Sequence, residues 1–139
     1  MNNKSCQMNP KEVIKQKIII PTDNTQIQQV GVDLTLRNSI ELEPHSFINT
    51  ELAEQFNMKD YFGFLVIRSS YSRKGIFISS GVYDPGFKGV GGISLYNMSD
   101  ETIKIDAGTR ICQIIVFKAN SASDYDGHYN HNNSIESKH

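Results

Sequence analysis

The chain has 139 residues, of which 38% are hydrophobic and 21% are charged, and its formal net charge is −1 at pH 7. These values predict one soluble globular domain that is large enough to bury a core of its own. A nearly neutral chain has no general positive field for a nucleic acid polymer, so any site for an anion must be local.

Cysteine content and hydropathy limit the setting of the protein further. Cys6 and Cys112 are too few for a disulfide framework, and Cys112 lies in an apolar run, which predicts a buried thiol. The N-terminus lacks the apolar centre of a signal peptide, and no run approaches the length of about 18 apolar residues that a spanning helix needs. We therefore expect a cytoplasmic protein with no membrane span.

The first predicted elements are a short helix and two strands. Residues 1–8 are polar, Asn9 can cap a helix and Pro10 suits its first position, so we expect a helix over about residues 10–16. A β-branched run at residues 17–20 follows. Between residues 29 and 36 apolar side chains alternate with Gly31, Asp33 and Thr35, which predicts a strand with one apolar face. From this spacing alone, Asp33 is a solvated strand carboxylate.

The middle of the chain gives mixed signals. Residues 40–48 predict a pair of strands that turns at residues 43–45, with His45 as an exposed turn residue rather than a metal ligand. Residues 50–58 are open between helix and strand, because Leu52, Ala53 and Phe56 also fit helical spacing. Residues 61–67 are nearly all apolar and predict a buried strand.

Residues 67–97 carry most of the candidate chemistry. The stretch begins with side chains that suit a phosphate, since Arg–phosphate pairs are charge-assisted and often bidentate: Arg68, Ser69, Ser70 and Arg73. Strands are predicted at residues 76–78 and 92–96, and Asp84 stands just before a tight Pro–Gly turn between them. Singly, these residues are an ordinary surface group and a turn cap. Their combination in this order favours a phosphate site with one carboxylate nearby.

The last predicted strands cover residues 102–105 and 111–117, and Gln113 is the one strongly polar side chain in the second of them. From residue 119 onward polar residues dominate, which predicts a flexible tail. His128 and His131 in this tail lack the partner ligands of a dedicated metal site. Short strands with little helix predict an all-β barrel or sandwich at residues 1–118, followed by the tail at 119–139.

Four ordered segments together resemble the trimeric dUTPase and dCTP deaminase superfamily. The segments are Gly31–Leu34, Arg68–Ser70, Gly81–Gly89 and Gly108–Gln113, and the likeness covers roughly residues 11–118. The resemblance implies the superfamily's distorted, jelly-roll-like β-barrel with a short N-terminal helix. It also implies a homotrimer whose sites lie at the subunit interfaces.

The resemblance assigns a role to each matching residue. Asp84 becomes the catalytic base that activates water for attack on the α-phosphate of a deoxypyrimidine nucleoside triphosphate. Phosphate contacts are expected from Arg68, Ser69, Ser70, Arg73 and Gln113. Nucleoside contacts are expected from Gly81, Val82, Tyr83 and Phe87, with Phe87 under the sugar. Mg²⁺ is expected to be held mainly by the phosphates, with Asp33 acting through a metal-bound water.

Departures from the pattern bear on which branch of the superfamily the chain follows. Deaminases carry a glutamate where Ser94 stands, and a serine cannot transfer protons at the cytosine amine. Residues 11–38 and the tail are closer to the deaminases, and the glycine- and arginine-rich arm of dUTPases is missing. Tyr125 and Tyr129 in the tail are candidates for a lid over the base.

The missing glutamate removes a chemical step of deamination, whereas an altered lid would only weaken binding, so we give the glutamate more weight. The sequence therefore predicts a magnesium-dependent dUTP diphosphatase that forms dUMP and pyrophosphate. A dCTP deaminase or a bifunctional enzyme is one alternative, and a non-catalytic nucleotide-binding regulator is the other. Because the base would be read by main-chain groups, the sequence leaves its identity open.

Overall fold

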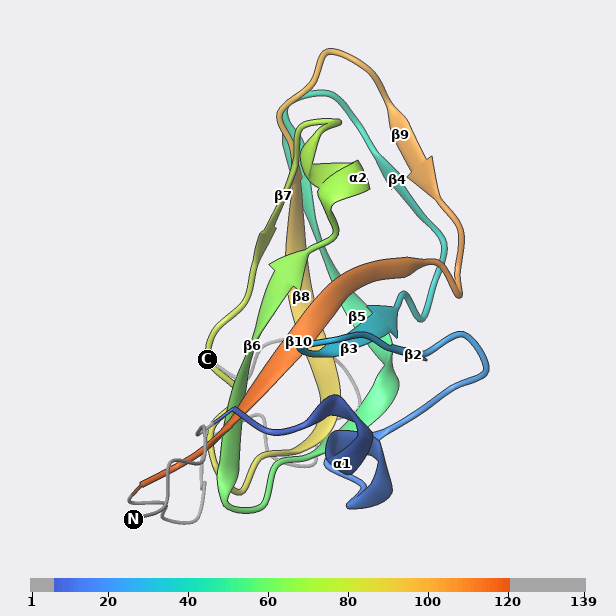
Figure 1. The fold of residues 1–139 in the computed structure, drawn as a ribbon. Helices are drawn as coiled ribbons and strands as arrows, with labels where there is room; N and C mark the ends of the chain where they lie inside the picture. Colours follow the sequence, from blue (N-terminus) through green and yellow to red (C-terminus); the bar gives the residue numbers. More distant parts are fainter. Residues whose placement is uncertain (1–6, 121–139) are drawn as a thin grey trace.

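The chain folds into two curled antiparallel sheets and a two-stranded ribbon (Figure 1), in a computed structural model that describes residues 7–120. The first sheet has the strand order β1 (Ile19–Ile20), β5 (Ser46–Asn57), β8 (Lys88–Asn97), β7 (Ile76–Ser79). The second sheet has the order β2 (Gln26–Ile27), β3 (Val32–Thr35), β10 (Arg110–Lys118), β6 (Tyr61–Ile67). The ribbon pairs β4 (Ile40–Leu42) with β9 (Ile103–Ile105). This half-barrel architecture confirms the predicted all-β fold.

Two short helices accompany the strands. α1 (Pro10–Lys15) forms where a helix was predicted, because Asn9 Oδ1 accepts a hydrogen bond from Lys11 N at 2.9 Å and Pro10 fits the first turn. α1 lies against β1 and β10, at the end of the molecule away from the ribbon (Figure 1). α2 (Ser69–Ser72) directly follows β6. Neither helix within residues 7–120 is long and apolar enough to cross a membrane.

The predicted pairing of strands at residues 40–48 is wrong. β4 pairs with β9, whereas β5 pairs with β1 and β8. His45 between them has a positive φ of 55°, and its Nε2 lies 2.7 Å from Asp100 Oδ1, so the turn is exposed and tied to the loop before β9. The open question at residues 50–58 resolves to strand, since burial there alternates with a period of two over most of β5.

The solvated face expected for residues 29–36 is also corrected. All four residues of β3 are buried, and only 2% of the Asp33 surface is exposed. β3 is enclosed because it pairs with β2 on one side and β10 on the other, and the Gln28 and Glu54 side chains bond to its polar face. Asp33 is therefore a buried carboxylate, a far less common state than a solvated one.

The strand at residues 61–67 forms as predicted, but it is not buried throughout. Gly63 is buried in the interior, whereas Phe64 is 38% exposed and Val66 is 45% exposed. These side chains lie opposite Ile115 and Gln113 of β10. The outer face of the two strands carries an apolar row that we call the β6–β10 stripe: Phe62, Phe64, Val66, Ile115 and Phe117.

Candidate functional site

Three of the predicted site residues meet at one end of the β6–β10 stripe. β10 lies between β3 and β6, so Gln113 faces Asp33 on one side and Val66 on the other, and Arg68 follows two residues later in the chain. Arg68 Nε lies 3.6 Å from Asp33 Oδ2, and the same carboxylate oxygen accepts a bond from Gln28 Nε2 at 2.7 Å. We call Asp33, Arg68 and Gln113 the polar cluster.

Main-chain contacts hold the polar cluster together. Arg68 Nη1 lies 3.4 Å from the carbonyl oxygen of Arg110, at the irregular start of the pairing between β10 and β3. Gly31 allows the close approach of Gln113, because a Cβ at this position would lie 2.7 Å from Gln113 Oε1 and would collide with the Ile114 carbonyl. Within residues 7–120, the buried Gln113 Oε1 has no hydrogen-bond partner. The cluster thus contains a buried acceptor that is unsatisfied within these residues.

The remaining predicted phosphate residues follow Arg68 on α2. Arg68 is the N-cap residue of this helix and Arg73 its C-cap. The side chains of Ser69, Ser70 and Arg73 are exposed. Because these residues follow Arg68 within one short helix, two hydroxyls and a second guanidinium lie beside the polar cluster. Their exposed side chains can turn toward an anion.

The hairpin predicted around Asp84 is open at its turn end. β7 and β8 pair from Ile76↔Asn97 as far as Ser79↔Ser94. Beyond this pair β8 stays on β5, whereas residues 80–83 diverge toward β6. We call the two diverging segments the fork. A Cβ at Gly81 would meet no atom within 4 Å, so there is open space at this position for a ligand.

Tyr83 and the turn after it are tightly held. Tyr83 N donates to Gly63 O at 2.8 Å, Gly63 N donates to Tyr83 O at 3.1 Å, and the Tyr83 hydroxyl donates to Gly92 O at 2.8 Å. Gly86 supplies the positive φ of 86° that the turn requires, and its N–H donates to Lys59 O. Asp84 itself is exposed. A solvated carboxylate thus stands on a fixed turn.

The two aromatic residues that are predicted to contact the nucleoside lie in the interior. Tyr83 is 8% exposed and Phe87 is 6% exposed, and both rings pack against Phe56 at centroid distances of 4.6 and 6.1 Å. Burial raises the pKa of the Tyr83 phenol well above its usual range. The main-chain N–H and carbonyl of Tyr83 bond to Gly63, whereas the two residues before it, Gly81 and Val82, are exposed.

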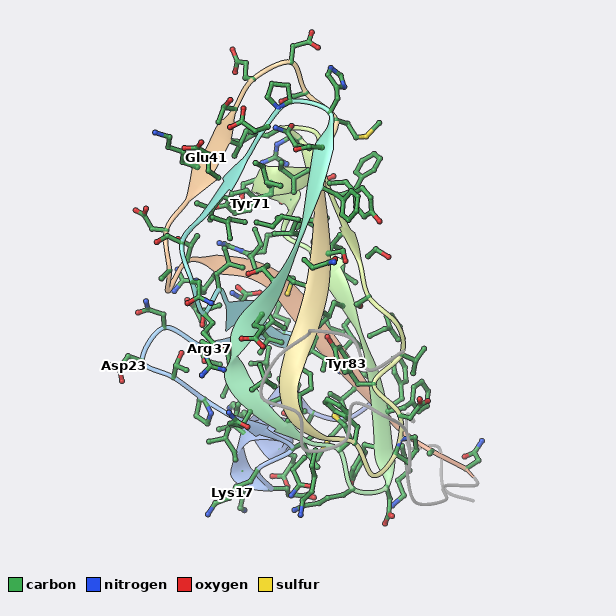
Figure 2. The ribbon with its side chains drawn as sticks, turned by 180° about the vertical axis from the view of Figure 1, so that it is seen from behind. Lys17, Asp23, Arg37, Glu41, Tyr71 and Tyr83 are labelled. Atoms are coloured by element: carbon green, nitrogen blue, oxygen red, sulfur yellow. The ribbon has the colours of Figure 1, made fainter. Side chains whose placement is uncertain are left out.

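The polar cluster and the turn at Asp84 occupy different places in one chain. Tyr83 bridges Gly63, whereas Gln113 faces Val66, three residues further along β6. At about 3.3 Å per residue, these points are roughly 10 Å apart. In Figure 2, Tyr71 on α2 and Tyr83 are labelled at different levels of the molecule. Within one chain, the structure therefore brings together Asp33, Arg68 and Gln113, and it holds Asp84 in a second group.

Position 94 lies at the closed end of the fork. Ser94 faces Ser79 on β7 and Asn49 on β5, and its hydroxyl donates a hydrogen bond to Asn49 Oδ1. This row of side chains is polar and uncharged. None of these three facing residues therefore has a carboxylate that could transfer a proton.

One buried carboxylate escaped the sequence analysis. Glu54 is fully buried, and it accepts hydrogen bonds from Thr35 N, Thr35 Oγ1 and Thr25 Oγ1. Cys112 is a free, buried cysteine, as predicted, and burial together with the nearby Glu54 and Asp33 carboxylates raises the pKa of its thiol. The sequence contains a signal for this burial, because in a strand Glu54 shares the inward face of Leu52 and Phe56.

Other predicted features lie elsewhere. Tyr125 and Tyr129 are outside the described residues. Among residues 7–120, no three His, Cys, Asp or Glu side chains are grouped so that they could hold a metal ion.

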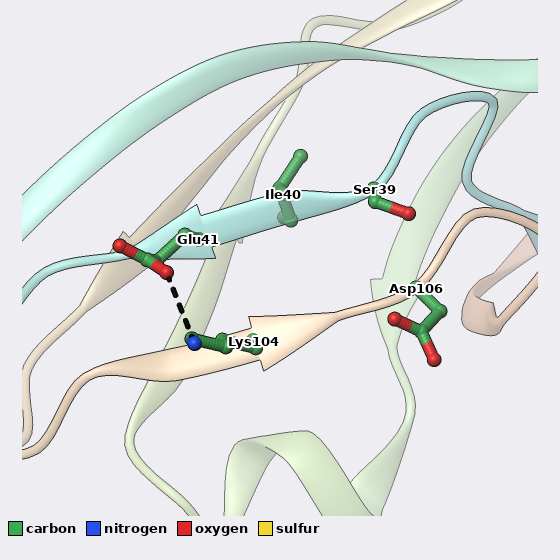
Figure 3. Close-up of a pocket in the computed structure, with 5 residues that line it drawn as sticks. All are labelled: Ser39, Ile40, Glu41, Lys104 and Asp106. Atoms are coloured by element: carbon green, nitrogen blue, oxygen red, sulfur yellow. Dashed lines mark ion pairs between the residues drawn. The ribbon is translucent and has the colours of Figure 1, made fainter.

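A pocket of about 280 Å³ lies on the β4–β9 ribbon (Figure 3), where the exposed Lys104 Nζ and Glu41 Oε1 are 3.5 Å apart. None of the predicted site residues lines this pocket.

Comparison with known proteins identifies the family. The sequence profile of the dUTPase family matches residues 16–136. A "dCTP deaminase, dUMP-forming" of Persephonella marina is 30% identical over 124 residues, which cover 86% of this chain and 67% of that protein.

Two solved structures share the fold. A variant of the dUTPase of phage phi11 of S. aureus has a TM-score of 0.62 and is 18% identical, over 77% of this chain and 92% of its own. The 2′-deoxycytidine 5′-triphosphate deaminase of Agrobacterium tumefaciens has a TM-score of 0.69 and is 15% identical, over 83% of this chain and 49% of its own. The chain belongs to the dUTPase family, in the superfamily of nucleotide-metabolising enzymes that also contains the dCTP deaminases.

Proposed function

We propose that the protein is a dUTP diphosphatase, which hydrolyses dUTP at the α-phosphate to give dUMP and pyrophosphate. The observation that carries the proposal is the contrast between Asp84 and position 94. A solvated carboxylate stands on the fixed turn, whereas the closed end of the fork has only neutral polar groups. This arrangement supports activation of a water at a phosphate rather than proton transfer at the base.

In this reaction Asp84 takes a proton from the attacking water, whose oxygen bonds to the α-phosphorus. The bond to the oxygen that bridges the α- and β-phosphates breaks, and pyrophosphate leaves. Asp84 is exposed at the end of the turn, where its carboxylate can reach a water beside the phosphate. Arg68, Arg73 and the α2 hydroxyls supply donors for the charge that grows on the phosphate oxygens.

Magnesium fits the polar cluster only through water. Asp33 is the one carboxylate of the cluster, and the orphaned Gln113 Oε1 beside it can accept a hydrogen bond from a metal-bound water. Mg²⁺ usually keeps several waters and takes few protein ligands when phosphates are present. When bound, the ion would supply charge neutralisation on the phosphates. The structure of the phage phi11 enzyme is described with a structural Mg(II) ion.

A homotrimer with shared sites is part of the proposal. Since the polar cluster and Asp84 are apart in one chain, a complete site needs the turn of a neighbouring copy beside the cluster. The β6–β10 stripe offers an apolar surface next to the cluster, and a second exposed row crosses the other sheet: Phe47, Tyr96 and Phe77. Two different apolar faces suit head-to-tail contacts, and a threefold rotation between copies would close such contacts into a ring.

Deamination of dCTP is the second candidate, because the relative from Persephonella marina is named a dUMP-forming dCTP deaminase. Ser94 cannot provide the carboxylate that this chemistry needs. The nearest alternative along the same face is Glu51, which lies two residues beyond Asn49 on β5. Glu51 Oε1 lies 3.5 Å from Arg37 Nη1. A nucleotide-binding regulator without turnover is the alternative from another class.

One experiment separates these functions. The purified chain is incubated with Mg²⁺ and, separately, dUTP, dCTP and the other deoxynucleoside triphosphates, and the products are resolved by chromatography. Formation of dUMP and pyrophosphate from dUTP alone supports the proposal. Uracil products from dCTP would instead establish deamination, and tight binding without turnover would make the protein a regulator.

A further inference from the structure

We propose that Tyr83 is a positioning residue whose phenol ties the two segments of the fork together and thereby fixes Asp84. The inference rests on the proposed function, because Asp84 is taken as the base of the reaction. It assigns to Tyr83 a role in its side chain, distinct from the main-chain contact with the nucleoside that the family resemblance implies.

The first support is the position of the hydrogen bond. Beyond the pair Ser79↔Ser94, β7 and β8 no longer bond to each other, and the two segments diverge. The Tyr83 hydroxyl crosses this gap and donates to Gly92 O at 2.8 Å, nine residues further along the chain. A side chain thus replaces the ladder of main-chain bonds at the place where the hairpin opens.

The second support is the anchoring of Tyr83 itself. Its main chain is paired with Gly63 of β6, and its ring packs against Phe56 of β5 and Phe87 at centroid distances of 4.6 and 5.6 Å. Tyr83 therefore connects β5, β6 and β8. Asp84 is the next residue, so its Cα is held by whatever holds Tyr83.

The third support is that the neighbouring residues make room for the aromatic rings. A Cβ at Gly91 would lie 2.8 Å from both Cε1 and Cζ of Phe56, which is too close for any side chain. Gly91 thus allows Phe56 to fill the space beneath Tyr83. An aliphatic residue at position 83 could pack in this interior, but it could not reach the Gly92 carbonyl with a donor.

The fourth support is the chemistry of the phenol. The buried hydroxyl keeps its proton because burial raises the pKa of Tyr83. The phenol therefore remains a hydrogen-bond donor to Gly92 O at neutral pH.

The test is Tyr83→Phe, which removes the hydroxyl and keeps the ring. We expect kcat for dUTP to fall about tenfold, because a small displacement of a catalytic group has effects of this order, while KM changes less than about threefold. Val13→Ala in α1 is the matched control, since it removes buried volume and leaves the hydrogen bond between Tyr83 and Gly92 intact. It should lower the melting temperature by at least as much and leave kcat unchanged.

Hydrogen exchange gives a readout that does not depend on turnover. In Tyr83→Phe, the amides of residues 81–84 should exchange at least about tenfold faster than in the native chain, while those of β9 should not change. If the native chain shows no turnover, the proposed function is rejected. Hydrogen exchange alone then tests whether the Tyr83 hydroxyl ties the fork together. Unchanged exchange, or a kcat loss no larger than that of Val13→Ala, would overturn the role of Tyr83.

Discussion

The polar cluster and the turn at Asp84 are held in place by different kinds of contact. In the cluster, charged and polar side chains bond to one another: Asp33 is bonded to Gln28 and lies beside Arg68. At the turn, main-chain bonds, one phenol and three packed aromatic rings fix an aspartate whose own side chain is exposed. The cluster is thus held by contacts between its own functional side chains, whereas the turn is held by contacts that do not involve the Asp84 carboxylate.

The comparison implies that the turn can lose its functional group without losing its shape. Asp84→Asn should lower kcat by at least about a thousandfold, because the variant removes the base and keeps every contact that holds the turn. Nucleotide affinity, measured by calorimetry with a non-hydrolysable dUTP analogue, should stay within about tenfold. An equal loss of affinity and turnover would show that Asp84 is structural.

The cluster should respond differently to the loss of a functional group. Arg68→Ala removes a charged phosphate donor and also leaves the buried Asp33 without its neighbouring positive charge. We expect triphosphate affinity to fall about a hundredfold, with a loss of stability as well. Deoxyuridine affinity should hardly change. A similar loss for nucleoside and triphosphate would contradict the phosphate role.

Two glycines, one in each region, should differ in their effect on stability. Gly31→Ala places a Cβ against the Ile114 carbonyl and should destabilise the fold by about 3 kcal/mol. Gly81→Ala meets no atom within 4 Å, so the free energy of unfolding should change by less than about 0.5 kcal/mol, while nucleoside affinity falls. Denaturant titration of both variants checks this pair, and equal stabilities would refute the contrast.

The smallest effect is expected outside both regions. Deletion of residues 121–139 should slow dUTP turnover about threefold to tenfold if Tyr125 or Tyr129 closes over the base. The melting temperature should be unchanged, because all the strands lie within residues 7–120 of the described structure. Steady-state kinetics of the shortened chain would show unaltered constants if the tail does not cover the site.

The comparison also explains what the sequence could predict. Local signals placed α1, the hairpin strands and the turn before Gly86, because caps, alternation and Pro–Gly pairs act over a few residues. Four ordered segments indicated the family and the residues of the polar cluster. The residues of the polar cluster come together because β10 pairs with both β3 and β6, which are far apart in the chain.

Nonlocal contacts account for the errors and omissions. The partner of β4 is β9, about 60 residues further along the chain, and no local pattern favours it over β5. Asp33 has the spacing of an exposed residue, and only the arrival of Gln28 and Glu54 buries it. Likewise, the tie between Tyr83 and Gly92 depends on a divergence of strands that alternation cannot show.

Glu54 has a consequence for how this sequence can vary among relatives. Its side chain accepts hydrogen bonds from Thr25 and Thr35, which belong to two segments that lie well before it in the chain. Replacing either threonine alone leaves a buried oxygen short of a donor, and replacing the glutamate alone leaves the Thr35 N–H without an acceptor. These three positions should therefore covary, changing together or not at all as the family diverges.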